Sequence, residues 1–197
     1  MRETTLKTSL RTLTQAGFTL VELLIVVIIL AILAAVVIPQ FASSTVDARE
    51  SALDANLAAM RGAIELYRAQ HGVYPGAVTA VGVAANCTGG TIGAGTIGTT
   101  PAVMEQLTTF SNAAGETCSL NVGSASRFGP YLRRGIPNDP ITSRGSLAAD
   151  IITVGLGTPL VGAAAATGGG WKYDTVSGQI IMNSIATDSN GRTYSLH

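Results

Sequence analysis

The sequence is poor in charged residues, and the few that it has balance. Asp, Glu, Lys and Arg make up 12% of the 197 residues, about half of their share in an average soluble domain. Acidic and basic residues number 12 each, so the formal net charge is zero. Because nucleic-acid binding depends on an excess of Lys and Arg that neutralises phosphates, the composition gives no indication of a nucleic-acid partner.

Residues typical of catalytic and metal sites are also scarce. The chain has two histidines, His71 and His197, and it lacks the Gly-x-Ser-x-Gly, Gly-Lys-Ser/Thr and His-Glu-x-x-His motifs. Its carboxylates show no pairing suited to acid–base catalysis. Asp188-Ser-Asn190-Gly191 is a fragment of a calcium loop without the further carboxylates, so we expect a turn there. We therefore predict that the protein is not an enzyme and uses no cofactor or metal.

What the sequence does contain is one long apolar block, residues 18–38, with a single charged residue, Glu22. As an α-helix this block would be about 30 Å long, the thickness of the hydrocarbon core of a bilayer. A secretory signal peptide has a shorter apolar region of about 7–15 residues. Arg2, Lys7 and Arg11 precede the block. By the positive-inside rule we expect that end to stay in the cytoplasm and the rest of the chain to be exported.

Glu22 is the residue that a plain membrane anchor leaves unexplained. A carboxylate within an apolar span costs about 2.5–3.5 kcal/mol and indicates a function with a specific partner. Residues 15–22, Gln-Ala-Gly-Phe-Thr-Leu-Val-Glu, and the apolar run up to Pro39 resemble the processing site of type IV pilins and of the pseudopilins of type II secretion. The resemblance implies that prepilin peptidase cleaves between Gly17 and Phe18, that the new amine of Phe18 is N-methylated, and that Glu22 becomes the fifth residue.

The carboxylate of Glu22 and the amine created on Phe18 are also a physically sensible pair. In a bundle of such helices, the amine of one subunit can meet the carboxylate of another. Two groups that are costly to bury alone become tolerable together, and the pair fixes the axial register between subunits. We therefore predict a role in assembly for Glu22.

The helix is expected to continue to about His71. Pro39 removes one helix hydrogen bond and is predicted to bend the helix without ending it. Like Glu22, it is predicted to have a role in assembly. Gly72 offers a C-cap and Pro75 a stop. The second half of this helix has one apolar stripe, which needs a globular cover. Charged residues, Glu50 among them, are expected on the remaining faces of the helix. The stripe comprises Val46, Leu53, Leu57, Met60, Ile64 and Tyr67.

Residues 73–197 are predicted to form a small globular β domain. We expect a short helix at 101–110, a strand at 150–155, and a hairpin of 170–174 with 179–183. Gly-Pro-Tyr-Leu at 129–132, Ile-Pro-Asn-Asp-Pro at 136–140 and Gly-Trp-Lys-Tyr-Asp at 170–174 resemble the globular domains of the same families. The resemblance implies an α+β fold, in which a long kinked N-terminal helix with a transmembrane first half packs against a small antiparallel β-sheet. Trp171 and Tyr173 are expected in its core.

Two cysteines, Cys87 and Cys118, lie in the part that we expect to be exported. In an oxidising compartment an isolated pair usually forms a disulfide bond, which is our prediction. The alternative is two free thiols buried as small apolar side chains. Neither cysteine has the neighbours of a zinc or redox motif.

These features divide the chain into a cleaved leader (1–17), a transmembrane and filament-core helix (18–38), the amphipathic second half of that helix (39–72) and the globular domain (73–197). The resemblance implies a subunit of a type IV pilus-like filament that starts in the inner membrane, with its globular part periplasmic. The assembled filament would be extracellular or periplasmic. Its partners would be prepilin peptidase, copies of itself and other pilin-like subunits, and the pilus or secretion assembly machinery.

Two alternatives remain. The first is a pseudopilin of type II secretion that drives protein export, because both families share the processing motif. The second is a membrane-anchored envelope binding module that never polymerises. Glu22 argues against the second alternative, because an anchor alone gains nothing from that carboxylate.

Overall fold

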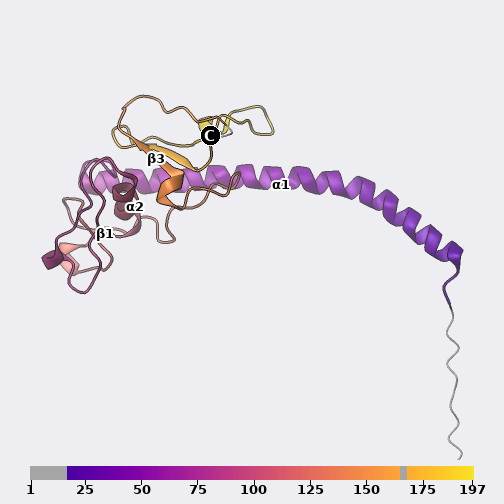
Figure 1. Ribbon diagram of the computed structural model, residues 1–197, viewed down its shortest axis with the longest axis horizontal. Coiled ribbons are helices and arrows are strands. Elements are labelled where there is room, and N and C mark those ends of the chain that lie inside the picture. The colour runs from indigo at the N-terminus through magenta and orange to yellow at the C-terminus, as the bar shows by residue number, and fades with distance from the viewer. Residues whose placement is uncertain (1–16, 165–167) are drawn as a thin grey trace, which may run out of the picture. The chain divides into compact units, whose positions relative to one another are not determined.

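The computed structural model describes residues 17–164 and 168–197 (Figure 1). Residues 1–16 of the predicted leader lie outside the described residues. The chain forms two compact units, one ending at Ser44 and the other comprising Thr45–His197.

One helix, α1, runs from Leu20 to His71, over 52 residues, and belongs to both units. It continues through Pro39, which confirms that this proline does not end the helix; the bend stays a prediction. At its C-terminus, Gly72 has a φ of 76° and donates its N–H to the carbonyl of Arg68 at 2.8 Å. Glycine adopts this left-handed conformation without steric cost, so the predicted end of the helix is confirmed.

The second unit adds one further α-helix and five short strands, together with 3-10 turns (Figure 1). Helix α2 begins behind Thr99, whose hydroxyl accepts the N–H of Ala102, and it has a proline in its first turn, as helix N-termini favour. It ends at Thr108, two residues before the predicted end. The elements are α2 (Thr100–Thr108), β1 (Phe110–Ser111), β2 (Thr117–Cys118), β3 (Ile151–Val154), β4 (Trp171–Asp174) and β5 (Ile180–Met182).

The main sheet has the strand order β3-β4-β5. Strands β4 and β5 pair antiparallel, with Trp171 opposite Met182, which confirms the predicted hairpin. Strand β3, however, pairs parallel to β4, with Ile151 opposite Trp171. The sheet is therefore mixed, and the prediction of a wholly antiparallel sheet was wrong on this point. The reason is the connection 155–170, which is long enough to return the chain to the same end of the sheet, as a parallel pair requires.

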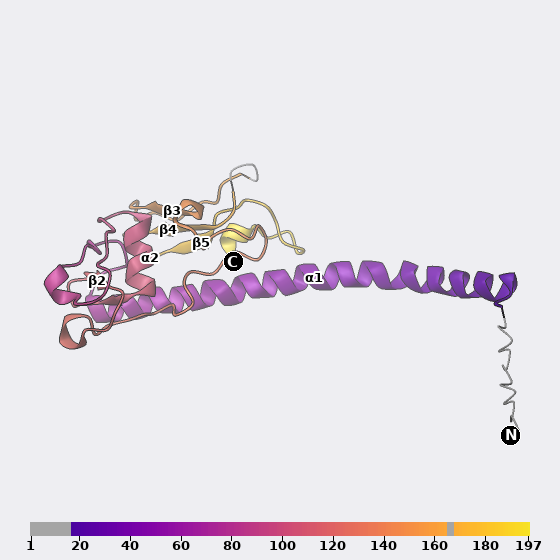
Figure 2. The same cartoon turned by 60° about the horizontal axis from the view of Figure 1, so that its bottom comes forward.

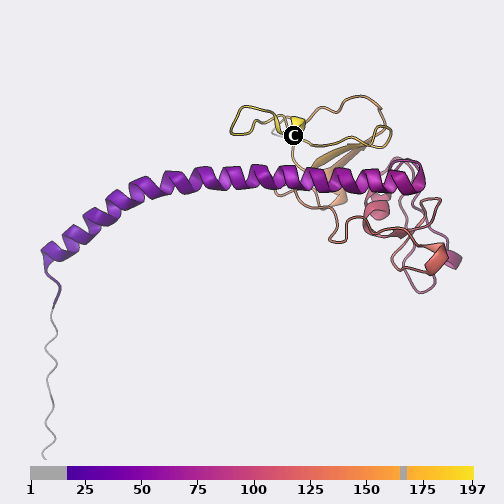
Figure 3. The same cartoon turned by 180° about the vertical axis from the view of Figure 1, so that it is seen from behind.

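The core of the second unit lies between α1, α2 and the sheet (Figures 2 and 3). Val46 departs from the predicted stripe: it is 41% exposed, because it lies at the edge of the unit, next to its first residue. The rest of the stripe is buried. Full burial of a large apolar side chain contributes about 1.5–3 kcal/mol, so the stripe is the main attachment of the globular part to α1. The five remaining stripe residues are at most 1% exposed: Leu53, Leu57, Met60, Ile64 and Tyr67.

Trp171 and Tyr173 are core residues, as predicted. They are 0% and 1% exposed. The indole Nε1–H of Trp171 donates to the carbonyl of Pro137 at 2.7 Å, and the hydroxyl of Tyr173 donates to the carbonyl of Pro75 at 3.1 Å. Each aromatic side chain therefore satisfies its polar atom while filling the core, as buried Trp and Tyr usually do.

A disulfide bond joins Cys87 and Cys118, with an S–S distance of 1.99 Å and a Cα–Cα distance of 5.5 Å. This is the predicted pairing. The bond links residues 76–100, a segment without charged residues, to β2. This segment is otherwise mostly loop.

Candidate processing and assembly site

The predicted cleavage site lies just before α1. Gly17, Phe18 and Thr19 are not helical, and the side chain of Phe18 is 88% exposed. A Cβ atom added at Gly17 would meet no described atom within 4 Å, and its φ is not in the left-handed region. Nothing in the described structure therefore requires glycine at this position, so the requirement must come from outside the chain if it exists.

Thr19 and Glu22 form a capping box at the start of α1. The backbone N–H and the hydroxyl of Thr19 each donate to Oε2 of Glu22 at 2.9 Å, and the N–H of Glu22 donates to the hydroxyl of Thr19 at 3.2 Å. This reciprocal arrangement satisfies N–H groups that a helix start leaves without partners. Among the described residues, no hydrogen bond uses Oε1 of Glu22. One carboxylate oxygen is thus held by Thr19, and the other is available.

The sequence analysis gave no role to Thr19, although the signal was present. A threonine followed three residues later by a glutamate, ahead of an apolar run, is the signature of a capping box.

The helix after this box presents an apolar surface in the first unit. Residues Leu20–Ile38 form a helical segment that is long and apolar enough to cross a membrane, and none of it is buried in the unit. Its large side chains, such as Leu23, Ile28 and Ile38, are between 41% and 82% exposed. Contiguous exposed apolar surface of this extent requires lipid or other helices as a cover.

Glu50 was predicted on one of the faces outside the apolar stripe, and the structure shows that the globular unit covers it there. It is only 8% exposed. Its carboxylate accepts the N–H and the hydroxyl of Ser189 at 2.8 and 2.7 Å and the hydroxyl of Tyr194 at 3.3 Å. These partners lie about 140 residues away in the chain, so a pattern along the helix could not reveal them.

The segment at Asp188 is a turn, as predicted. Oδ1 of Asp188 accepts the N–H groups of Asn190 and Arg192 at 2.8 and 2.7 Å. The carboxylate thus caps its own turn. Among the described residues, no group of three or more His, Cys, Asp or Glu side chains is placed to hold a metal ion.

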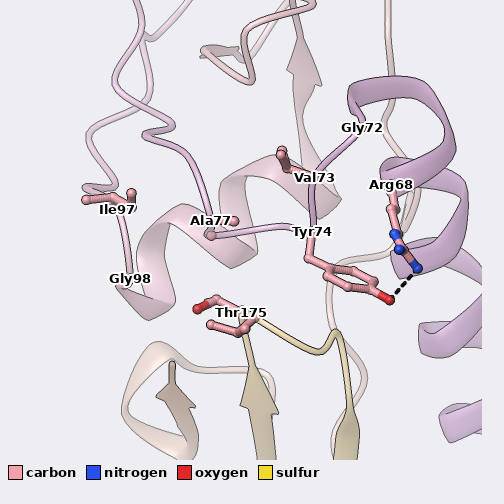
Figure 4. Close-up of a pocket in the computed structure, with 10 residues that line it drawn as sticks. Arg68, Gly72, Val73, Tyr74, Ala77, Ile97, Gly98 and Thr175 are labelled. Carbon is pink, nitrogen blue, oxygen red and sulfur yellow. Dashed lines mark hydrogen bonds between the residues drawn. The ribbon is translucent and has the colours of Figure 1, made fainter. Parts of the chain in front are cut away.

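A groove of the second unit at the C-terminal end of α1 has no catalytic character. It measures about 480 Å³ and lies beside Val73, Ile97 and Thr175 (Figure 4). Its cation, Arg68, is already engaged: it donates to the hydroxyl of Tyr74 at 2.6 Å and stacks over that ring at 4.5 Å. The lining offers no nucleophile next to a base, which catalysis by such a groove would need.

A family model described as a prokaryotic N-terminal methylation motif matches residues 13–38. The chain is 37% identical over 112 residues to the type IV narrow pilus major component PilA5 of Thermus thermophilus, covering 56% of this chain and 90% of that protein. It is 39% identical over 61 residues to the type II secretion system core protein G of Pseudomonas aeruginosa, covering 31% and 43%. It is 39% identical over 72 residues to the type IV major pilin PilE of Neisseria gonorrhoeae, covering 36% and 43%.

The length covered differs between these relatives. The chain spans less than half of core protein G and of PilE but nearly all of PilA5. No solved structure matches the chain.

Proposed function

The chain belongs to the family of type IV pilins and type II secretion pseudopilins, and on this basis we propose that it is the structural subunit of a type IV pilus-like filament. In this proposal prepilin peptidase removes residues 1–17 and the amine of Phe18 is methylated. The subunit spans the inner membrane once, with its globular unit in the periplasm. The assembly machinery then moves it into a filament of identical and pilin-like subunits, held together by the apolar half of α1.

The observation that carries this proposal is the geometry around Glu22. The only carboxylate in the apolar segment keeps one oxygen, Oε2, on Thr19, and its other oxygen accepts no hydrogen bond from the described residues. Cleavage after Gly17 creates a cationic amine on Phe18. The free oxygen of one subunit is then a ready acceptor for the amine of another.

The energetics of such a pair favour assembly over solitary anchoring. A single charge in an apolar span costs about 2.5–3.5 kcal/mol on insertion scales. Two opposite charges that meet in the bundle offset part of that cost, and the contact is possible at one axial register only. The exposed apolar side chains of residues 20–38 provide the remaining contact area between subunits.

We propose the segment boundaries given above for this processed subunit, with 18–38 as the transmembrane and filament-core part. Pro39 follows that part directly. Loss of its N–H lets the helix bend at the exit from the apolar layer, so the globular units can be placed around the bundle.

A type II secretion pseudopilin is the second candidate. It is favoured by the similarity to core protein G, which is confined to 61 residues. The similarity to PilA5 extends over 112 residues, more than the 71 positions up to the end of the helix, so it includes part of the globular domain at 73–197 and favours the pilus subunit. A membrane-anchored binding module that never polymerises would use Glu22 only to cap the helix and would leave its second carboxylate oxygen without a role.

The proposal is tested by shearing cells that express the protein and identifying the main component of any released filaments. We expect filaments that consist mainly of this chain, beginning at Phe18. Protein that stays entirely in the membrane fraction under conditions of normal expression would contradict the filament function. Filaments that form only as short periplasmic structures, together with loss of protein export when the gene is deleted, would identify the pseudopilin instead.

A further inference from the structure

The globular unit carries a basic surface near the C-terminal end of α1, formed by Arg127, Arg133 and Arg134. All three side chains are exposed. Within the described residues, none of them forms an ion pair with a carboxylate. Arg127 stacks over the ring of Phe128 at 4.8 Å, which fixes its position without neutralising its charge.

Contacts of the same segment place this basic surface along the helix. The ring of Phe128 lies 5.0 Å from the ring of His71, edge to face. The hydroxyl of Tyr131 donates to Oε1 of Gln70 at 2.6 Å. Phe128 and Tyr131 therefore lie at the last turn of α1, and Arg127, Arg133 and Arg134 are within three positions of them in the sequence.

An acidic hollow lies at the other end of the globular unit. It measures about 320 Å³. Glu50 and Asp188 are committed to their own hydrogen bonds, as described above. Asp54 is 61% exposed and bonds to Nδ1 of His197 at 2.8 Å, and Asp47 is exposed and forms no ion pair within the described residues. The hollow is lined by Asp47, Glu50, Ser51, Asp54, Asp188, Ser189, Asn190 and His197.

The two surfaces are too far apart to neutralise each other in one subunit. Asp54 and His71 are separated by 17 positions on α1, which corresponds to about 26 Å along the helix. Screening in physiological salt reduces charge–charge interactions over about 8 Å. Figure 2 shows the C-terminus and β2 at well-separated points along this part of α1. Neither surface is therefore neutralised by the other within one subunit.

We propose that the basic surface of one subunit docks against the acidic hollow of a second copy, and that this contact sets the lengthwise order of the globular units in the filament. The proposal rests on the proposed filament function. A contact between two different surfaces of the same chain is head-to-tail, and it generates an open array when it repeats. An antiparallel dimer closed on itself would pair the same two surfaces twice, but it leaves none free to continue the array, whereas the head-to-tail contact leaves one basic surface and one acidic hollow open at the ends.

Exposed ion pairs add little affinity individually, but they select partner and register. In this proposal the apolar helices supply most of the binding energy, and the charged contact decides which arrangement of globular units forms. A second copy is the occupant that we infer, since each copy carries both an acidic and a basic surface, so the charge of either surface finds its complement on another copy.

The test is a charge swap in the full-length protein expressed in its own cells. One variant carries Arg133→Glu with Arg134→Glu, a second carries Asp47→Lys with Asp54→Lys, and a third carries all four changes. We expect each two-residue reversal to lower the yield of sheared filaments about tenfold or more, because it brings like charges face to face. The four-residue variant restores the complementarity and should recover yield to within about twofold of wild type.

Controls separate this contact from folding and from the filament function itself. Lys172→Glu makes the same change of sign outside both surfaces and should leave the yield unchanged. Membrane levels of every variant report folding, and Asp47→Lys alone avoids the bond between Asp54 and His197. No filaments from wild type would refute the filament function. Normal filaments from both reversals, or no recovery in the four-residue variant, would refute the docking contact. If the variant Arg133→Glu with Arg134→Glu forms normal filaments, and these filaments only bind less well to an anionic polymer, then the basic surface binds that polymer and the proposal is wrong.

Discussion

Oε2 of Glu22 accepts both the backbone N–H and the hydroxyl of Thr19, each at 2.9 Å. The one carboxylate of the apolar segment is therefore held in place by the residue that caps the helix. Capping residues contribute about 0.5–2 kcal/mol to helix stability. Here the same hydrogen bonds also restrict the rotamer of Glu22 and so orient its carboxylate. Two functions, starting the helix and presenting the carboxylate, share one pair of residues.

Processing at the Gly17–Phe18 bond is the first prediction. Protein recovered from native cells should begin at Phe18 and carry one methyl group on its amine, as measured by intact mass. Gly17→Leu should block cleavage, although a side chain at this position meets no described atom. Gly62→Ala, at another glycine without close neighbours, should be processed normally. Retention of residues 1–17, or a cut beyond Ile38, would rule out this processing.

The disulfide is the second prediction. Thiol labelling of unreduced, denatured protein should find neither Cys87 nor Cys118 free. Their separation is 31 positions, and closing a loop of this size contributes about 3–4 kcal/mol in the chain-entropy model. The variant Cys87→Ser with Cys118→Ser should therefore unfold at a clearly lower temperature, measured by circular dichroism. An unchanged melting temperature would mean that the loop is held by its other contacts.

A dependence of stability on pH at His71 is the third prediction. Burial lowers the pKa of this imidazole below its ordinary value of 6.5, because desolvation disfavours the charged form. Its ring stacks on Tyr67 with centroids 4.0 Å apart, and Nε2 lies 3.1 Å from the hydroxyl of Tyr131. The unfolded chain then binds a proton more readily than the folded one as pH falls below about 6.5. Stability should decrease with falling pH from there to the lowered pKa.

The measurement for His71 compares unfolding by denaturant at pH 7.5 and pH 5.5. Wild type should lose more stability over this interval than His71→Gln, whose side chain does not titrate. Equal losses in both proteins would assign the pH dependence to other groups.

Local patterns in the sequence were sufficient for the parts of the fold that depend on neighbours along the chain. The spacing of Leu53, Leu57 and Tyr67 identified the buried stripe, and Gly72 identified the helix end. The hairpin of β4 and β5 followed from a short turn between two β-rich segments. Each of these features is decided within about fifteen residues, the range over which helix periodicity and turn preferences act.

Features that depend on distant partners could not be predicted in this way. The carboxylate of Asp174 is fully buried and accepts the N–H groups of Leu156 and Gly157 at 3.0 and 2.8 Å. That contact holds the long connection after β3 and permits the parallel pairing of β3. The same holds for Asp139, also fully buried, which accepts the N–H of Gly170 at 2.8 Å. Both residues stood in recognised motifs, but a motif does not say which backbone amides its carboxylate will meet.

Replacement of Glu22 is the last prediction, and the proposed function depends on it. Glu22→Ala removes the only charge of the apolar segment, so insertion into the membrane becomes easier by about 2.5–3.5 kcal/mol. The protein should therefore accumulate in the membrane at least as well as wild type. Assembly should nonetheless fail or slow sharply, because the amine of an incoming Phe18 would enter the bundle without a partner. Loss of one member of a buried pair costs about 3–5 kcal/mol, a hundredfold or more in an equilibrium constant.

The control for Glu22 is Thr19→Val, which keeps the carboxylate and the bond from the backbone N–H but removes the hydroxyl donor. This variant loses only part of the cap, about 1 kcal/mol, so filament yield should fall far less than in Glu22→Ala. Membrane level and sheared filament yield are measured for the three proteins under identical expression. A simple anchor requires the opposite order, in which Glu22→Ala is the firmest anchor and shows no defect. Normal filament yield from Glu22→Ala would therefore remove the partner that we assign to the amine of Phe18, and with it the mechanism by which the subunits find their register.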